Sequence, residues 1–596
     1  MSSDPFALPK QSAHLGRYRR AVLQTLARLR AQQFVQQLWQ KDASLWSADV
    51  GIQAKISNRL GWLTSPETMQ VECVRINQFV RGVQQAGFTQ ALLLGMGGSS
   101  MCPEVCRTTF GVAPGFLDLQ VLDTTDSATI RARAQAVDLE RTLFIVSSKS
   151  GTTTETISLY KYFYDCLRTL RGEAAGQNFI AITDAGTPLA QQASERKFRD
   201  CFLNPADIGG RFSALSFFGL VPAALVGVDI AALLARARAM MQVCRPDVPV
   251  EENPAVVLGA LLGTLYQRGR DKVTFLLAPS IASFAYWVEQ LVAESLGKVG
   301  KGIVPVEGER LASPALYAAD RVFVAIDLDR RARRLRALER AGHPVIRISL
   351  ADKLDLAAEL YRWEVAIATA GAVMQLNPFD EPNVQESKEN TERLLRKFGA
   401  TGHLPEELPT FVHGGLRVFA PPLLAQKLRR GTTGADGLEL FFANFLRLAR
   451  AGDYIGLTAY IQPTKVHQRA LEVIRRRLHE GLRRVVTLGY GPRFLHSTGQ
   501  LHKGGPNNGL YFQLVATDAV DMGVPGEPYS FSILKQAQAL GDFAALREKQ
   551  RRVLRVHLGD DVTTGLAEFG RVLGRAVVLA CKRKRARAKV RKLRRH

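Results

Sequence analysis

The feature that most constrains the fold is a series of short, continuously apolar runs separated by segments of helix length. Strands of a parallel sheet have such runs, because helices cover both faces of the sheet. We therefore expect βαβ units and an α/β fold with parallel sheets. The runs that we assign to strands form two series, first 91–95, 119–123, 142–147 and 178–183, then 273–278, 302–306, 321–326 and 344–349.

The two series predict two tandem α/β domains with helical extensions at both ends of the chain. A chain of 596 residues is also too long for one hydrophobic core of ordinary size. The expected division is a helical N-terminal arm at 1–60, α/β domains at 61–245 and 246–400, a helical or mixed C-terminal segment at 401–580 and a basic tail at 581–596.

The net charge of +24 is unevenly distributed, because ten Lys or Arg residues lie among the last sixteen. Such a tail can bind nucleic acid or another acidic partner nonspecifically. A solvated extension of the preceding helix is the favoured interpretation. No other segment indicates a nucleic-acid reader.

The chain has no feature that predicts export or a membrane span. The most apolar stretch, 212–235, is interrupted by Pro222 and Asp229, so it predicts a pair of buried helices. The N-terminus lacks the charged and apolar regions of a signal peptide. Seven scattered cysteines without a C-x-x-C motif favour a reducing compartment. We expect a cytoplasmic protein.

Two loops that follow apolar runs are rich in glycine and hydroxyl groups: "GMGGSS" at 95–100 and "SSKSGTTTE" at 147–155. Backbone N–H groups at a glycine turn or a helix start suit the oxygens of a phosphate, as do hydroxyls and a lysine. Each loop alone equally fits a turn without a ligand. Together, at one edge of a parallel sheet, they predict a pocket for a sugar monophosphate. The candidate ligands are Gly98, Ser99, Ser148, Lys149, Ser150, Thr152 and Thr153.

These loops belong to a set of six motifs that resembles the phosphoglucose isomerase family. The other four are "IGGRFSALS" at 208–216, "AESLGK" at 293–298, "NPFDEPNVQESK" at 377–388 and "HSTGQ" at 496–500. The set is most similar to the isomerase half of transaldolase/phosphoglucose isomerase fusions. Only 94 residues precede Gly95, too few for a transaldolase barrel, so transaldolase activity is not expected.

The resemblance implies two sugar-isomerase (SIS) type domains and a C-terminal segment that completes the active site. It also implies interconversion of glucose 6-phosphate and fructose 6-phosphate through a cis-enediol, in glycolysis and gluconeogenesis, without metal or cofactor. The family is typically a homodimer in which the histidine can come from the neighbouring chain.

Four residues take roles from the resemblance. Glu294 matches the base that moves a proton between C1 and C2, and a carboxylate remains ionised at neutral pH. Arg211 matches the cation that stabilises the enediol charge. His496 matches the residue that opens the sugar ring, with Lys388 at the ring oxygen.

Each of these residues also has a purely structural reading. Glu294 would pair with Lys298 four residues later on a helix. Arg211 would bridge two domains. His496 would be a loop residue, with His502 as its obvious competitor.

Two features depart from the family pattern. The histidine segment usually precedes the lysine segment, whereas His496 follows Lys388 here. Glu381 stands where the family commonly has a glutamine that contacts the sugar phosphate. A glutamate about 4 Å from a phosphate costs about 4 kcal/mol per unit charge at an effective dielectric near 20. We expect Glu381 to point away, to pair with a cation or to weaken substrate binding.

Two other functions stay open. The first is an isomerase that also accepts mannose 6-phosphate. The second is a sugar-phosphate sensor without turnover, whose basic tail binds nucleic acid. Retention of Glu294, Arg211, Lys388 and His496 argues against the sensor, because a sensor needs no base.

Overall fold

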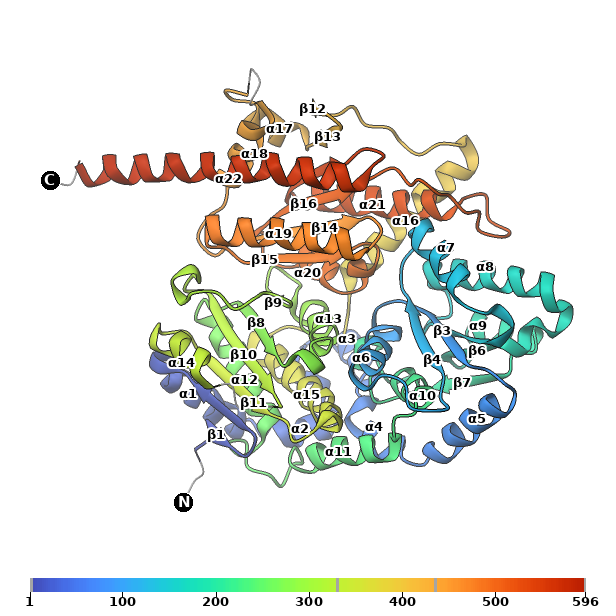
Figure 1. Ribbon diagram of the computed structural model, residues 1–596. Helices are drawn as coiled ribbons and strands as arrows, with labels where there is room; N and C mark the ends of the chain where they lie inside the picture. Colours follow the sequence, from blue (N-terminus) through green and yellow to red (C-terminus); the bar gives the residue numbers. More distant parts are fainter. Residues whose placement is uncertain (1–3, 329–331, 433–436, 594–596) are drawn as a thin grey trace.

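The computed structural model describes residues 4–328, 332–432 and 437–593. Its strands form three sheets, each packed between helices (Figure 1). The eight apolar runs assigned to strands all lie in the first two sheets, so the expected α/β fold is confirmed.

The first sheet has five strands in the order β4-β3-β5-β6-β7, and every neighbouring pair is parallel. Its faces are covered on both sides, because Leu93 of β3 packs into one apolar core and Leu92 and Leu94 pack into another. The strands are β3 (Gln90–Gly95), β4 (Asp118–Leu122), β5 (Thr142–Ser147), β6 (Phe179–Asp184) and β7 (Asp200–Asn204). The helices of this region are α5 (Cys73–Gln85), α6 (Met101–Phe110), α7 (Ser127–Ala136), α8 (Thr154–Arg171), α9 (Pro188–Glu195) and α10 (Phe217–Leu225).

The second sheet has the order β1-β2-β11-β10-β8-β9, with β8 to β11 parallel. Its strands are β1 (Ala7–Leu8), β2 (Gln11–His14), β8 (Lys272–Leu277), β9 (Val304–Val306), β10 (Arg321–Asp327) and β11 (Val345–Ser349). The helices of this region are α11 (Ile230–Gln242), α12 (Pro254–Gln267), α13 (Phe284–Leu296), α14 (Ala332–Arg340) and α15 (Leu356–Met374). Helices α10 and α11 lie where a pair of buried helices was expected at 212–235: every residue of α10 is buried, whereas α11 buries one face and exposes Ala235 and Arg238.

The N-terminal arm differs from the helical prediction. Its helices α1 (Arg19–Ala31), α2 (Phe34–Trp39), α3 (Val50–Ser57) and α4 (Ser65–Thr68) follow a short hairpin of β1 and β2. Strand β2 pairs antiparallel with β11 and thereby satisfies the free backbone groups of that strand's outer edge. The arm is therefore part of the second sheet.

The C-terminal segment also differs, because it contains a sheet of its own in the order β12-β13-β17-β16-β14-β15. Strands β14 to β17 are parallel, and β12 and β13 are antiparallel additions at one edge. The strands are β12 (Phe411–His413), β13 (Leu416–Phe419), β14 (Tyr454–Tyr460), β15 (Val486–Tyr490), β16 (Gly509–Val515) and β17 (Arg552–His557). The helices after α15 are α16 (Pro382–Thr401), α17 (Pro422–Leu428), α18 (Gly437–Arg447), α19 (Lys465–Leu482), α20 (Thr498–Gly504), α21 (Phe531–Glu548) and α22 (Val562–Leu593).

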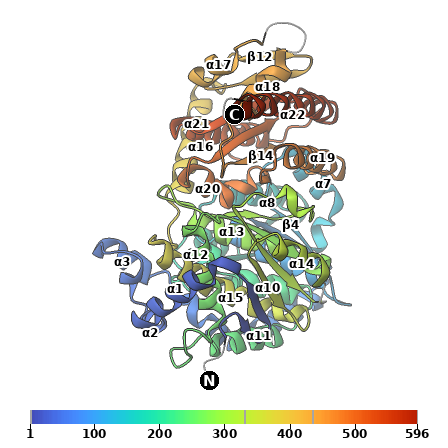
Figure 2. The same ribbon diagram turned by 90° about the vertical axis from the view of Figure 1, so that its left-hand side faces the viewer.

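The third sheet lies across one end of the other two sheets (Figures 1 and 2). Helices α13 and α20 contact each other, and so do α16 and α20, where the third-sheet region meets the rest of the molecule. Helix α22 packs on α18 and α19, and its C-terminal end extends beyond them (Figure 1). No helix of the described residues is both long and apolar enough to cross a membrane.

Candidate active site

Three chain segments meet at a glycine turn after β3. A side chain at Gly98 would place its Cβ 2.0 Å from the carbonyl oxygen of Gly210, so only glycine fits there. Gly97 has a positive φ of 58°, and a Cβ at this position would lie 3.1 Å from both Cβ and the carbonyl oxygen of His496. The absence of side chains thus lets the first sheet contact both the Arg211 segment and the His496 segment.

Arg211 lies in a short 3₁₀ turn, Gly210–Phe212, between β7 and α10, and its side chain is buried. Its Nη1 donates to Glu294 Oε1 at 3.2 Å and to Glu381 Oε2 at 2.9 Å. Its Nη2 donates to the carbonyl oxygens of Pro378 at 2.6 Å and Asp380 at 3.0 Å. Its Nε donates to Ser295 Oγ at 2.7 Å.

Glu294 lies near the end of α13, with its side chain only 10% exposed. Burial raises the pKa of Glu294, Arg211 opposes this shift, and the charge of Glu381 adds to it. A carboxylate beside a fixed guanidinium can accept a proton and release it again. The alternative pairing with Lys298 is not observed, because the Lys298 ammonium binds Asp380 Oδ1 at 2.8 Å.

Lys298 binds the loop that contains Pro378 and Asp380, the two residues whose carbonyl oxygens accept hydrogen bonds from Arg211. Its ammonium also donates to the Asp380 carbonyl oxygen, which is itself an acceptor for Arg211. Burial and the nearby Arg211 charge lower the pKa of Lys298 to about 8, although Asp380 opposes the shift.

His496 lies in a 3₁₀ turn, Arg493–His496, between β15 and α20. Its Nε2 is 2.8 Å from Glu155 Oε1, which also accepts from Gln538 Nε2 at 2.7 Å. Burial raises the pKa of Glu155, but the interactions with His496 outweigh it and the pKa is lowered. The imidazole is thereby oriented by an ionised carboxylate in the same chain.

Gln290 joins the glutamate and histidine parts of the site. Its Nε2 donates to Glu294 Oε2 at 3.0 Å and to the His496 carbonyl oxygen at 3.0 Å. Its Oε1 is buried and has no hydrogen-bond partner among the described residues. One acceptor therefore remains available between the two groups.

Lys388 of α16 lines a small cavity with Glu155, His496 and Gln538. Its ammonium makes no hydrogen bond or ion pair within the described part of the chain, while its charge helps to lower the pKa of Glu155. A lysine beside the His496 imidazole is thus free to contact a ligand.

The hydroxyl-rich loop lies at the start of α8. Ser148 Oγ is 3.0 Å from Thr153 Oγ1, and Thr152 Oγ1 donates to Ser150 Oγ at 3.0 Å. Lys149 bonds with Asp184 and donates to the Ala206 carbonyl oxygen at 3.1 Å, so its ammonium is already engaged. In the glycine loop, Ser99 is buried and its carbonyl oxygen accepts from Ser147 Oγ at 3.1 Å.

His502, the competitor of His496, lies outside this set. Its ring packs 4.9 Å from the Tyr511 ring and 5.9 Å from the Phe494 ring. Burial lowers the pKa of His502 to about 3. It behaves as a neutral core residue.

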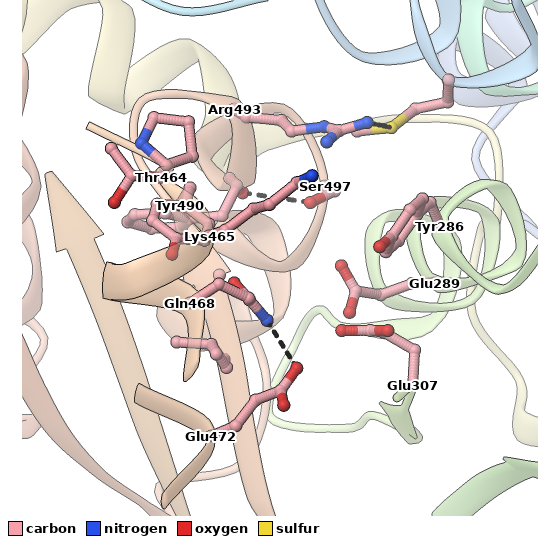
Figure 3. Close-up of a pocket in the computed structure, with 15 residues that line it drawn as sticks. Tyr286, Glu289, Glu307, Thr464, Lys465, Gln468, Glu472, Tyr490, Arg493 and Ser497 are labelled. Carbon is pink, nitrogen blue, oxygen red and sulfur yellow. Dashed lines mark hydrogen bonds between the residues drawn. The ribbon is translucent and has the colours of Figure 1, made fainter. Parts of the chain in front are cut away.

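A wider cavity of about 460 Å³ also borders the His496 segment, between α13 and the third-sheet region. Figure 3 shows the carboxylates of Glu289 and Glu307 side by side in it. Burial and the charge of Glu307 raise the pKa of Glu289 to about 8. This cavity contains Arg493 and Ser497 but none of the candidate catalytic side chains.

Sequence reasoning missed two polar residues of the site. Glu155 ends the motif at 147–155 but is not among the candidate residues, although a glutamate directly after a phosphate-type loop is a usable signal. Gln290 precedes Glu294 by four residues, and this spacing places both on one face of a helix. The described residues hold no group of three or more His, Cys, Asp or Glu side chains arranged for a metal ion.

Comparison with known proteins identifies relatives of the chain. The family model described as Phosphoglucose isomerase matches residues 68–310. The chain is 30% identical to a probable glucose-6-phosphate isomerase of Natronomonas pharaonis, over 51% of this chain and 78% of the relative. It is 26% identical to the glucose-6-phosphate isomerase of Carboxydothermus hydrogenoformans, over 58% of this chain and 87% of the relative.

Solved structures share the fold. A glucose-6-phosphate isomerase of Chlamydia trachomatis aligns with a TM-score of 0.53 and 18% identity, over 68% of this chain and 92% of that chain. The hypothetical protein TT0462 of Thermus thermophilus aligns with a TM-score of 0.53 and 23% identity, over 64% of this chain and 95% of that chain. With a matching family model and a relative that is 30% identical over 78% of its own length, the chain belongs to the phosphoglucose isomerase family.

Proposed function

We propose that this protein interconverts glucose 6-phosphate and fructose 6-phosphate. The observation that carries the proposal is the convergence of Glu294, Arg211 and His496 from three separate parts of the chain. Arg211 bonds directly to Glu294, and Gln290 joins Glu294 to the His496 carbonyl oxygen. The printed names of the relatives in the family agree with this activity. A sensor would require only the phosphate loop.

In the proposed reaction the phosphate binds at the two loops, and their hydroxyl and N–H groups fix the sugar. The Ser148, Ser150, Thr152 and Thr153 hydroxyls surround the start of α8, where the helix dipole favours an anion. Gly98 and Ser99, in the glycine loop, form the other side of the proposed phosphate site. The remaining side chains then meet the C1 to C5 part of the sugar.

Ring opening is assigned to His496 and Lys388. The imidazole transfers a proton between the ring oxygen and the C1 hydroxyl, while the Lys388 ammonium stabilises the ring oxygen. Glu155 holds the imidazole in place through its 2.8 Å contact. In this step the C1–O5 bond breaks as the C1 carbonyl forms, and the proton taken from the C1 hydroxyl is delivered to the ring oxygen.

The isomerisation step is assigned to Glu294 and Arg211. The Glu294 carboxylate removes the proton from C2 of the open aldose and returns it to C1, while the hydroxyl proton passes from O2 to O1, which gives the ketose. The intermediate cis-enediol carries negative charge on oxygen, and Arg211 provides a fixed positive charge nearby.

A coupled assay that follows formation of glucose 6-phosphate from fructose 6-phosphate tests the proposal. Wild-type chain should turn over, and Glu294→Gln should lose about a thousandfold in kcat because the base is absent. Glu289→Gln, the same change five residues earlier on α13, is the matched control and should keep wild-type activity. Wild-type protein that binds the sugar phosphate without turnover would favour the sensor instead.

Substrate range and assembly complete the proposal. An assay with mannose 6-phosphate separates a strict isomerase from a bifunctional one.

A homodimer is proposed from the family resemblance, and sedimentation at assay concentration tests it. We propose that His496 acts in its own chain, and its contact with Glu155 of the same chain supports this.

A further inference from the structure

Arg211 has no free hydrogen-bond donor. A guanidinium has five N–H groups, one on Nε and two on each Nη. All five are used, by the Ser295 hydroxyl, two carbonyl oxygens and two carboxylates. A substrate oxygen can accept a hydrogen bond from Arg211 only after one of these acceptors has left.

The two carboxylates on Nη1 differ in how firmly they are held. The Glu294 side chain is 10% exposed and is also bound by Gln290, whereas the Glu381 side chain is 46% exposed. Glu381 directly precedes α16, and within the described residues its carboxylate bonds only to Arg211. The carbonyl acceptors and Ser295 belong to packed backbone or to α13. Glu381 is therefore the acceptor that leaves at the lowest cost.

We propose that Glu381 is an exchangeable counter-ion that occupies Arg211 in the empty site and gives way to an oxygen of the bound sugar, the one that becomes negatively charged in the intermediate. This inference rests on the proposed isomerase function and adds a residue that sets affinity. The buried guanidinium is never left without an anion, since one carboxylate remains until the substrate replaces it. Glu381 lowers the affinity of the site for any ligand that must accept a hydrogen bond from Arg211 Nη1, because the ligand has to displace the Glu381 carboxylate.

Glu381 also acts on the base. The carboxylates of Glu381 and Glu294 both accept a hydrogen bond from Arg211 Nη1. The negative charge of Glu381 raises the pKa of Glu294, in addition to the effect of burial. Without the charge of Glu381, the Arg211 guanidinium should lower the pKa of Glu294 further, which favours the ionised carboxylate. The acid limb of the kcat/KM profile reports this base in the free enzyme.

The test compares the full-length chain with Glu381→Gln and with Glu392→Gln, an exposed glutamate further along α16 that serves as the matched control. Glutamine keeps the shape and an acceptor oxygen but has no charge. The measurements are kcat and KM for fructose 6-phosphate between pH 5 and 9, and calorimetric binding of 6-phosphogluconate, which carries a carboxylate in place of the reacting carbonyl. Thermal melting reports whether each variant is folded.

For Glu381→Gln we expect KM and the dissociation constant of 6-phosphogluconate each to fall about threefold or more, with kcat changed less than KM. The acid limb should move to lower pH. The substrate phosphate ionises equally in all assays, so a shift confined to this variant belongs to the enzyme. Glu392→Gln should match wild type in every measurement.

Unchanged or weaker binding with an unmoved acid limb, in a Glu381→Gln variant that melts like wild type, overturns the inference and leaves the isomerase function intact. Absence of turnover in wild-type protein overturns the function. Binding of 6-phosphogluconate then still decides about Glu381, because tighter binding by the variant supports the counter-ion role and equal or absent binding rejects it.

Discussion

The imidazole of His496 and the carboxylate of Glu155 lie 2.8 Å apart in a single chain, although 341 residues separate them in the sequence. Glu155 begins α8 of the first-sheet region, and His496 lies between β15 and α20 of the third. The third sheet thereby places its histidine over the first sheet. Each chain holds a full set of candidate catalytic groups.

We expect that two inactive variants will not restore each other. Glu294→Gln lacks the base and His496→Ala lacks the imidazole. If both groups of a site come from one chain, every site in a mixed assembly retains a defect. Activity after co-expression or joint refolding should therefore equal the sum of the separate variants. Recovery well above that sum would show that the histidine comes from a partner chain.

Activity should fall as the pH rises through about 8, where Lys298 loses its charge. The folded protein lowers the pKa of Lys298, so the ammonium is present below about pH 8 and is lost above it. The neutral amine binds Asp380 less strongly, and the loop that positions Arg211 loosens. The kcat/KM profile should show this alkaline limb.

Lys298→Met should lower kcat/KM about tenfold at pH 7 and remove the limb, since no titrating group remains at that position. Glu289 has a similar pKa of about 8 in the neighbouring cavity, so it is the necessary control. Glu289→Gln should retain the limb. A limb that disappears in Glu289→Gln and persists in Lys298→Met assigns the titration to the wider cavity.

Gly98→Ala should destabilise the protein and impair catalysis. The new Cβ would lie 2.0 Å from the Gly210 carbonyl oxygen, which is backbone and cannot rotate away. Overpacking of this kind costs about 1 to 3 kcal/mol of unfolding free energy and would push the first sheet away from Arg211. Melting temperature and kcat/KM measure both effects.

Gly210→Ala is the control on the opposite side of the same contact, since its Cβ would meet no atom within 4 Å. It should melt close to wild type. Equal destabilisation by the two substitutions would contradict the steric explanation.

Deletion of 582–596 should leave the isomerase rate within about threefold of wild type. Among the side chains that the structure describes, the buried apolar residues of α22 lie between Leu566 and Ala580, before the deleted segment. Cys581 Sγ, which bonds with the Gly481 carbonyl oxygen at 3.2 Å, is also retained. A large loss of rate or of thermal stability would show that the tail has a structural role.

Local patterns identified much of the fold. Runs such as 142–147 predicted strands because their apolar residues are continuous, and all eight runs became strands of the first two sheets. The third sheet was not predicted. Its strands include Gln513 and Tyr454, whose buried polar groups find hydrogen-bond partners only in the folded chain: Gln513 Nε2 donates to the Ala539 carbonyl oxygen at 3.0 Å, and the Tyr454 hydroxyl lies 2.7 Å from that of Tyr511. The pairing of β2 with β11 spans more than 300 residues, so no local pattern could reveal it.

The sequence by itself determined the parallel α/β regions and the family, and it predicted Glu294, Arg211, Lys388 and His496 as candidate catalytic residues, because these depend on residue types within short segments. The tertiary structure alone decided which groups meet. It paired Glu155 with His496, joined Gln290 to Glu294 and placed Glu381 on Arg211. The physical reason is that hydrogen bonds and pKa shifts depend on distance and burial in space, and residues hundreds of positions apart acquire these only when the three sheets pack together.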